Sequence, residues 1–389
     1  MNILYIMRYW PVYGGGETIT VTLSNEFVRR GHNVFIAYTY YNTIDPMPYS
    51  LADKIKSKKL FTIEGYKKTD IDQLRQYIID NDIDIMINQW GNTTLCDLAR
   101  KGTKCKFITC WHLSVLLPLG DEKNWKRRLA QPILGKKFFE RRWRNYQMKN
   151  HLNNYNRSDK YVFLAKSFEE EYRQLSGIDD KANKFYAINN PLTYHYSYDM
   201  AQYESKKKEV LYVGRIYEYQ KRVSYVLKIW KLIENEQQFN DWALKIVGDG
   251  PDKKASENLA TELGLKRVSF EGFKDPKPYY LDSSIFMMTS AMEGFGMTLV
   301  EAQQYGVVPL AMDTYSSLHE IIENGKNGVI IQDNDLNGYA KAIEKLMTDT
   351  AYRKQIAENG LKTCKKFTVE HIADEWEHLF NEMTKQNNE

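Results

Sequence analysis

The sequence predicts an α/β protein with two doubly wound, Rossmann-like domains that face a cleft. Three observations lead to this prediction. At 389 residues the chain is too long for one ordinary core, so two domains of roughly 180 residues each are expected. Short apolar runs alternate with amphipathic helical patterns, which is typical of parallel sheets covered by helices on both faces. This alternation breaks once, at the polar segment 193–208, and then starts again.

The first half of the chain predicts one such domain, residues 1–192. A glycine-rich loop, Gly14–Glu17, follows the first strand and precedes the first helix. The expected strands are 3–7, 34–40, 83–88, 107–110, 161–164 and 185–188, and the expected helices are 18–30, 71–79, 94–100 and 167–175.

A linker, 193–208, and a second domain, 209–367, are expected to follow. The last helix, around 369–383, has no strand after it, so we expect residues 368–389 to return to the first domain. The expected strands of the second domain are 210–213, 244–247, 268–270, 285–289, 307–311 and 329–331.

Composition limits the class of protein. Hydrophobic residues make up 43% and charged residues 27%, with a net charge of +4, as in soluble globular proteins. No apolar run is long enough for a membrane span or a signal peptide, so we expect a cytoplasmic protein, at most attached to a membrane surface. The four cysteines show neither metal-ligand spacing nor a disulfide framework, which favours reduced thiols: Cys96, Cys105, Cys110 and Cys364.

The most informative stretch runs from Glu293 to Glu301. It follows a buried strand and opens a helix that closes at Gly306, so Glu293 lies in the loop and Glu301 near the first helical turn. A carboxylate accepts hydrogen bonds from both hydroxyls of a diol, and free amides at a helix start favour a phosphate. The pattern therefore suits a ligand with hydroxyls and phosphates, and the alternative is an ordinary glycine-bounded turn.

Two further loops follow strands at their carboxyl ends, where doubly wound sheets bind ligands. Gly14–Glu17 is placed to face a phosphate, or is a flexible turn. It is not the Gly-x-Gly-x-x-Gly pattern of dinucleotide enzymes, which disfavours hydride transfer. Arg215 and the Lys221-Arg222 pair are placed to neutralise a diphosphate, or form a solvated basic turn.

His112 follows another strand and is placed to act on an acceptor hydroxyl, although packing beside Trp111 explains it equally well. Asp82-Ile-Asp84 resembles a metal site but precedes its strand, so we interpret it as structural and expect no metal.

The segment 121–157 carries eleven Lys or Arg against three Asp or Glu, with aromatic residues between them. Such a mixture can lie on an anionic membrane surface or form a solvated helical face. The residues expected at an acceptor or membrane surface are Arg127, Arg128, Arg141 and Arg142.

Taken together, these motifs resemble the retaining glycosyltransferases of family 4, which have the two-Rossmann B fold. Glu293-Gly-Phe-Gly-Met-Thr-Leu-Val-Glu301 matches the Glu-x7-Glu signature of that family, and Gly14–Glu17, Gly214-Arg215 with Lys221, Gly248-Asp-Gly250 and Asn190-Pro191 occur in the family order. The Arg215-to-Lys221 spacing is one residue longer than usual, and Arg222 replaces a common glycine, so either Lys221 or Arg222 could contact the diphosphate.

The resemblance implies a role for each site residue. Arg215 and Lys221 would hold a nucleotide diphosphate, Glu301 the ribose hydroxyls, and Glu293 the donor sugar. His112 would lie on the acceptor side. The other residues implied to bind the donor are Gly15, Gly16, Gly272, Phe273, Phe295, Gly296, Met297 and Thr298.

The resemblance thus implies metal-independent, retaining transfer of a sugar, with a UDP-sugar as the expected co-substrate and no separate cofactor. The expected acceptor is a saccharide or lipid-linked saccharide used in surface polysaccharide assembly, and no nucleic acid is expected. A sugar-nucleotide epimerase of the same fold and a non-catalytic nucleotide-sugar-binding protein are the alternatives.

Overall fold

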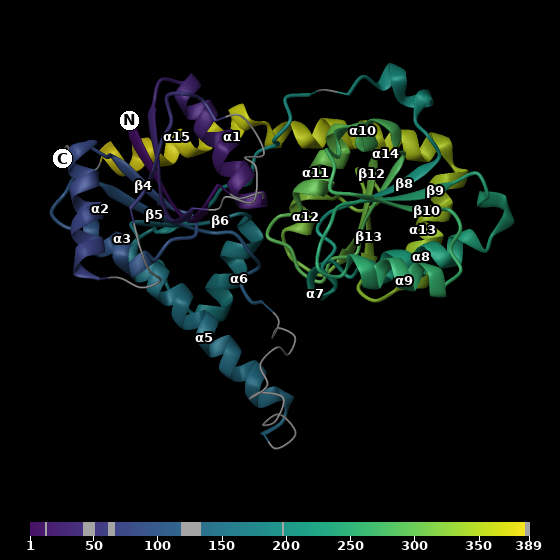
Figure 1. The fold of residues 1–389 in the computed structure, drawn as a ribbon, viewed down its shortest axis with the longest axis horizontal. Coiled ribbons are helices and arrows are strands. Elements are labelled where there is room, and N and C mark those ends of the chain that lie inside the picture. Colours follow the sequence, from purple (N-terminus) through teal and green to yellow (C-terminus); the bar gives the residue numbers. More distant parts are fainter. Residues whose placement is uncertain (12–13, 42–50, 61–66, 118–133, 197, 386–389) are drawn as a thin grey trace. The chain divides into compact units, whose positions relative to one another are not determined.

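The computed structural model describes residues 1–11, 14–41, 51–60, 67–117, 134–196 and 198–385. The chain forms two compact units (Figure 1): unit 1 contains Met1–Thr193 and Phe367–Glu389, and unit 2 contains Tyr194–Lys366. Each unit is built around a parallel sheet with helices on both faces, which confirms the predicted fold class.

The described strands of unit 1 lie in the order β3-β2-β1-β4-β5-β6-β7. All these strands are parallel. The order in which they are added reverses at β1: β2 and β3 lie on one side of it, and β4 to β7 lie on the other. The strands are β1 (Asn2–Trp10), β2 (Asn33–Tyr41), β3 (Lys56–Lys59), β4 (Ile85–Asn88), β5 (Lys106–Trp111), β6 (Lys160–Phe163) and β7 (Phe185–Ala187). The helices are α1 (Gly15–Arg29), α2 (Lys68–Asp80), α3 (Thr93–Arg100), α5 (Lys136–Arg157), α6 (Lys166–Ser176) and α15 (Val369–Lys385).

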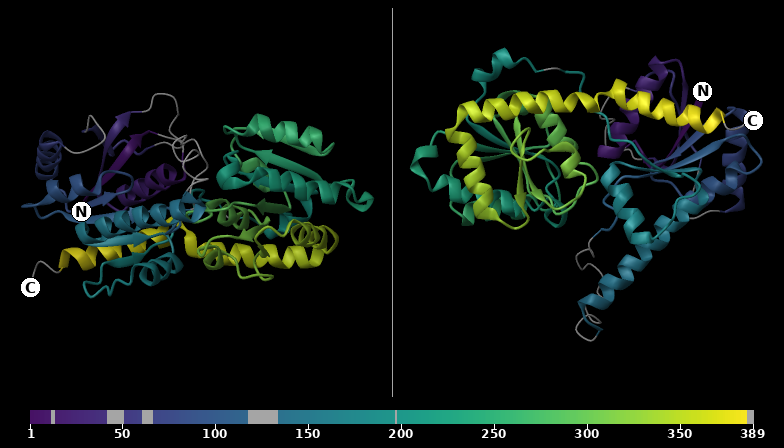
Figure 2. Two further views of the ribbon diagram at one scale, coloured as in Figure 1. Left: turned by 90° about the horizontal axis from the view of Figure 1, so that it is seen from below. Right: turned by 180° about the vertical axis from the view of Figure 1, so that it is seen from behind.

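The last helix, α15, packs on α1 within unit 1, as Figure 2 shows in yellow. Its apolar face supplies Phe380, whose ring lies 5.6 Å from that of Phe27. Ion pairs hold the rim of this contact: Arg30 binds Asp374 at 2.6 Å and Glu377 at 2.7 Å. The helix therefore completes the core of unit 1.

Unit 2 has the strand order β10-β9-β8-β11-β12-β13. The order in which strands are added reverses between β8 and β11. Helices α8, α9 and α13 cover one face, and α10, α11 and α14 cover the other (Figure 1). The strands are β8 (Glu209–Val213), β9 (Ala243–Val247), β10 (Val268–Gly272), β11 (Ile285–Met288), β12 (Val308–Asp313) and β13 (Val329–Gln332). The helices are α7 (Glu218–Lys221), α8 (Val223–Glu234), α9 (Lys253–Glu262), α10 (Lys277–Asp282), α11 (Met297–Gln304), α12 (Leu318–Ile321), α13 (Leu336–Thr348) and α14 (Thr350–Thr363), with short 3-10 turns η1 (Met200–Ser205), η2 (Gln237–Phe239) and η3 (Cys364–Phe367).

The structure differs from the sequence-based expectations at three places. Most of the segment expected to be a linker belongs to unit 2, where Tyr198 and Tyr203 are buried in the core. Helix α1 begins at Gly15, so Gly15 and Gly16 form its first turn instead of a loop. Strand β3 was not predicted, because its four residues are all exposed and carry no apolar pattern.

Candidate functional site

The candidate donor site lies where the strand order of the unit 2 sheet reverses. Strands β8 and β11 are neighbours there, and the loops that follow them meet at the carboxyl edge of the sheet, where the Ala291 amide donates to the Gln220 carbonyl at 2.7 Å. Doubly wound sheets bind ligands at this point. The loop after β8 leads to Lys221, and the loop after β11 carries Glu293.

Lys221 and Glu293 form an ion pair across these two loops. The Nζ of Lys221, the last residue of α7, lies 2.5 Å from the Oε1 of Glu293. Only 17% of the lysine side chain and 9% of the glutamate side chain are exposed. Burial, and secondly the negative charge of Glu293, raise the pKa of the Tyr212 and Tyr315 phenols. These phenols are therefore neutral at physiological pH.

The neighbouring cation, Arg222, has a different environment. It adopts a left-handed backbone conformation with φ of 48°, which turns its side chain toward the strand ends. Its Nε donates to the carbonyl of Thr289 at 2.7 Å, its Nη2 to that of Ser290 at 3.0 Å, and its Nη1 to Asp333 at 2.8 Å. Arg222 thus fixes the loop after β11, and Lys221 is the cation beside Glu293.

Helix α11 presents its N-terminus to the same edge. Gly296 precedes the helix with φ of 97°, and a Cβ there would lie 2.7 Å from the Oη of Tyr315. Phe295 is buried and anchors the loop, while Met297 and Thr298 begin the helix, where amides lack helical partners. The arrangement favours an anion in front of α11.

Glu301 lies one turn further along α11. The buried phenol of Tyr280, on α10, donates to its Oε2 at 3.0 Å. Burial, and secondly the charge of Glu301, raise the pKa of Tyr280, so the phenol remains a donor. This contact holds the carboxylate in one orientation.

Glycines allow the remaining loops at this edge to pack closely. A Cβ on Gly248, where φ is 144°, would lie 1.9 Å from the carbonyl oxygen of Gly214. Gly272 ends β10 with φ of 76°, and Phe273 after it is 60% exposed. Arg215 is exposed, and its guanidinium lies 5.6 Å from the centroid of the Tyr217 ring.

The corresponding edge of unit 1 brings Gly16, Trp90 and His112 together. A Cβ on Gly16 would lie 2.9 Å from the Nε1 of Trp90, and the rings of Trp90 and His112 are 4.8 Å apart. Burial lowers the pKa of His112 to about 4, so its imidazole is neutral. Among the described residues, its buried Nε2 has no hydrogen-bond partner.

The basic-aromatic segment is partly described. Arg141 and Arg142 are exposed on α5, whereas Arg127 and Arg128 lie outside the described residues. The C-terminal half of α5 is anchored by His151, whose Nδ1 lies 2.6 Å from the Tyr161 hydroxyl. The first half projects from the sheet of unit 1 (Figure 1). In the described ranges, no helix is both long and apolar enough to cross a membrane.

Comparison with known proteins places this geometry in a family. Residues 13–193 match the model described as Glycosyltransferase Family 4, and residues 199–363 match that of Glycosyl transferases group 1. Together the two models span most of the chain. The chain belongs to the family 4 glycosyltransferases.

Three curated relatives of this glycosyltransferase show how far the similarity extends. A GalNAc-α-(1→4)-GalNAc-α-(1→3)-diNAcBac-PP-undecaprenol α-1,4-N-acetyl-D-galactosaminyltransferase from Campylobacter jejuni is 24% identical over 95% of this chain and 96% of the relative. A lipopolysaccharide 1,6-galactosyltransferase from Salmonella typhimurium is 26% identical over 90% of each chain. For an uncharacterized glycosyltransferase from Haemophilus influenzae, at 28% identity, the match spans 51% of this chain and only 56% of the relative.

A solved structure supports the fold. The pneumococcal O-GlcNAc transferase GtfA, in complex with UDP and GlcNAc, superposes with a TM-score of 0.74 at 11% identity, over 98% of this chain and 99% of that one. The glycosyltransferase therefore has the B fold.

Two residues that contact the candidate site residues, Trp90 beside His112 and Tyr280 beside Glu301, were missed in the sequence. Trp90 follows strand β4 at its carboxyl end, so the rule that selected His112 could have found it. Tyr280 lies on α10, and its contact with Glu301 on α11 joins two residues that are 21 positions apart in the sequence. No local pattern indicates that contact.

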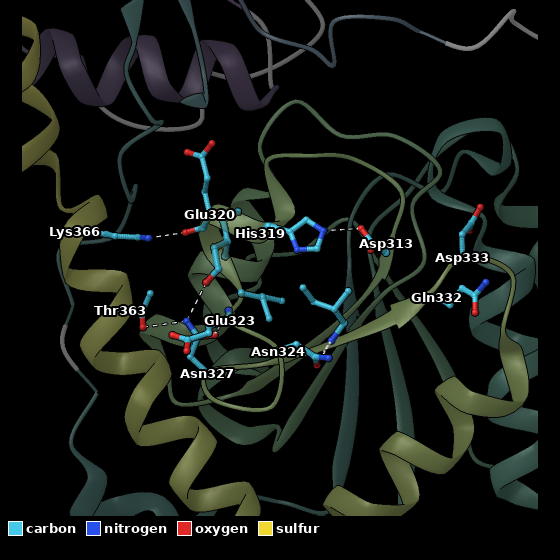
Figure 3. Close-up of a pocket in the computed structure, with 13 residues that line it drawn as sticks. Asp313, His319, Glu320, Glu323, Asn324, Asn327, Gln332, Asp333, Thr363 and Lys366 are labelled. Atoms are coloured by element: carbon cyan, nitrogen blue, oxygen red, sulfur yellow. Dashed lines mark hydrogen bonds and ion pairs between the residues drawn. The ribbon is translucent and has the colours of Figure 1, made fainter. Parts of the chain in front are cut away.

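Two other features lie apart from these edges. Asp82 and Asp84 bind the Nζ of Lys104 at 2.9 and 2.7 Å, which supports the structural interpretation. A cavity of about 800 Å³ lies beside the edge strand β13. There His319 faces Asp313 at 2.9 Å (Figure 3), and none of the predicted site residues that the structure describes lines the cavity.

Proposed function

We propose that this glycosyltransferase transfers a sugar from a UDP-sugar to a hydroxyl of a saccharide or lipid-linked saccharide, with retention at the anomeric carbon. The observation that carries the proposal is the Lys221–Glu293 pair beside the start of α11, at the point where the strand order of the unit 2 sheet reverses. It combines a cation, free amides and a carboxylate. These groups suit a diphosphate joined to a sugar.

The proposed chemistry breaks the bond between the anomeric carbon and the diphosphate oxygen. Negative charge grows on the leaving diphosphate, where Lys221, Arg215 and the amides at the start of α11 stabilise it without a metal. The acceptor oxygen forms the new bond on the same face of the sugar, and its proton passes to a phosphate oxygen of the leaving group. Glu293 orients the donor sugar, and Glu301 holds the ribose hydroxyls.

The neutral, buried imidazole of His112 supports an acceptor-side role in unit 1. Its unpartnered Nε2 is suited to a sugar hydroxyl, since a buried polar atom gains most from a hydrogen bond. The undecaprenol-linked substrate named for the Campylobacter relative supports a lipid-linked acceptor and a role in surface polysaccharide assembly. The UDP in the pneumococcal neighbour supports a uridine donor.

Donor hydrolysis tests this proposal. We would incubate the protein with a panel of UDP-, GDP- and ADP-sugars and measure release of the nucleotide diphosphate. We expect slow release from one donor. Glu301→Ala should lose this release, whereas the control Glu262→Ala, on the exposed side of α9, should keep it. Conversion of the donor to an epimer would point to the epimerase instead, and nucleotide binding without turnover to a binding protein.

We also propose that α5 attaches the enzyme to an anionic membrane surface on the cytoplasmic side. Exposed cations alternate with exposed aromatics on its first half, including Phe138 at 46% and Tyr146 at 55% exposure. Cations attract anionic lipid, and aromatic rings favour the lipid–water interface. No described acidic residue of α5 other than Glu140 offsets this charge.

Vesicle sedimentation tests the membrane proposal. The variant Arg141→Glu/Arg142→Glu should lose binding to phosphatidylglycerol vesicles. The control Lys341→Glu/Lys345→Glu changes the net charge equally on α13, at exposed positions of unit 2, and should bind as the wild type does. Equal binding by both variants would refute a specific role for α5.

A further inference from the structure

Strands β1 and β2 extend beyond their neighbours at the carboxyl edge of unit 1. Strand β4 pairs with β1 only from Ile3 to Ile6, and β3 pairs with β2 only up to Tyr38. The pairing of β1 with β2 continues to Tyr9 with Tyr40 and Trp10 with Tyr41. The two strand ends thus form a two-stranded parallel extension.

This extension carries exposed aromatic rings. Tyr9 and Tyr40 lie side by side on one face, with ring centroids 5.0 Å apart and planes inclined by 25°. Tyr9 is 44% exposed and Tyr40 is half-buried, whereas Tyr41, which pairs with Trp10, lies on the opposite face of the sheet. The guanidinium of Arg8 lies 5.3 Å from the Tyr9 centroid. We name Arg8, Tyr9 and Tyr40 the tyrosine ledge.

The ledge is unusual for a strand end in a parallel sheet. Such strands are normally buried on both faces, and earlier residues of both strands follow that rule, from Ile3 to Met7 and from Val34 to Tyr38. Beyond the point where the neighbouring strands stop, Arg8 and Tyr9 are exposed and Tyr40 is half-buried, while Trp10 remains buried. Large apolar rings held next to each other in water suggest a surface that binds a ligand.

The chemistry of the ledge favours a sugar over a lipid surface. One face of a pyranose ring presents C–H groups that pack on an aromatic ring, while its hydroxyls remain available to polar groups. Tyrosine suits such a ligand, because its body is apolar and its tip is polar, and its ring loses little conformational entropy on binding. The ledge carries one cation, whereas attraction to an anionic membrane needs several.

We propose that the tyrosine ledge binds sugar rings of the saccharide acceptor, away from the reacting hydroxyl. This inference rests on the proposed function. Its place in the fold supports it: the ledge lies at the end of β1, which neighbours β4, and Trp90 and His112 follow β4 and β5 at the same edge of this sheet. An acceptor of several sugars would reach both His112 and the ledge.

A glycan array tests the ledge. The probe is a printed set of bacterial surface saccharides, with the labelled full-length protein applied to it. We expect the wild type to bind at least one saccharide, and Tyr9→Ala/Tyr40→Ala to lose roughly tenfold in apparent affinity, which corresponds to one stacking contact. Tyr9→Phe/Tyr40→Phe keeps the rings and should retain binding. Tyr352→Ala, on α14 in unit 2, is the matched control.

The outcomes separate the ledge from the donor site. The alanine variant should hydrolyse the donor as the wild type does, because neither tyrosine is among the residues expected to bind the donor. Three outcomes would each overturn the inference. The alanine variant and the wild type could bind glycans equally, or the wild type could bind no glycan. The third outcome is that the alanine variant loses binding to neutral lipid vesicles instead of binding to glycans. Absence of donor hydrolysis in the wild type would instead refute the proposed function. Circular dichroism melting would confirm that each variant is folded.

Discussion

Tyr280→Phe gives a sharp test of how Glu301 is held. The substitution removes only the hydroxyl that donates to the Oε2 of Glu301 at 3.0 Å. The phenol is fully buried. A hydrogen bond to a charged group contributes about 1.5–3 kcal/mol, so the carboxylate loses an interaction that fixes its orientation.

The expected kinetic effect is a change in donor binding. Taking about 1.5 kcal/mol as the loss, the KM for the donor should rise roughly tenfold. The kcat should change little, because an interaction with the ribose is equally strong in the ground state and the transition state. Steady-state donor hydrolysis gives both constants, and calorimetry with UDP measures the affinity without turnover.

Tyr339→Phe is the matched control. Tyr339 is also fully buried, and its hydroxyl donates to the Leu310 carbonyl at 2.7 Å, a contact inside the core. Both variants should lower the melting temperature, but only Tyr280→Phe should weaken UDP binding. Unchanged UDP affinity in Tyr280→Phe, with a melting temperature like that of the control, would refute the reasoning.

Three further predictions concern other parts of the site. Lys221→Met should lower kcat by about 100-fold or more, as expected when a group that stabilises a leaving anion is lost. Arg222→Met should mainly lower the melting temperature, because it frees the loop after β11. The opposite pattern would reverse the roles of the two residues. Gly296→Ala should weaken UDP binding and lower the free energy of unfolding by roughly 1–3 kcal/mol, since the new Cβ would meet Tyr315 at 2.7 Å and φ is 97°. Calorimetry would detect the change in UDP affinity, and melting would detect the loss of stability. A UDP affinity and a melting temperature equal to those of the wild type would exclude the clash. Burial holds the pKa of His112 at about 4 in the fold, below the usual 6.5, so the stability that depends on neutral His112 is present above pH 6.5 and is lost as pH falls toward 4. Urea unfolding between pH 7 and pH 5 should therefore show a loss about 2 kcal/mol smaller in His112→Gln than in wild type, and equal losses would contradict a buried neutral imidazole.

The sequence predicted the parts of the fold that are encoded locally. Strand β11, its loop and helix α11 were predicted because apolar residues, glycines and a helical pattern follow one another within about twenty residues. The same information could not separate Lys221 from Arg222. Only the left-handed backbone at Arg222 directs one side chain to Thr289 and leaves the other beside Glu293.

Other features depend on contacts that sequence patterns do not carry. The Tyr-rich segment before β8 has a polar composition, which favoured a linker, yet Tyr203 is buried in the core of unit 2. The tyrosine ledge depends on where β3 and β4 stop relative to β1 and β2. The length of each strand is set by its neighbours in the sheet, so the exposure of Tyr9 could not be predicted.

The docking of α15 on α1 has a consequence for synthesis on the ribosome. Unit 2 is complete once Lys366 has been made, whereas unit 1 contains both the first 193 residues and the segment from Phe367 onward. Domains usually fold in the order in which they are made, but here the apolar face around Phe27 stays uncovered until Phe380 leaves the exit tunnel. The nascent chain therefore carries a half-finished first unit throughout most of translation, which makes it a candidate for chaperone protection until the final helix arrives.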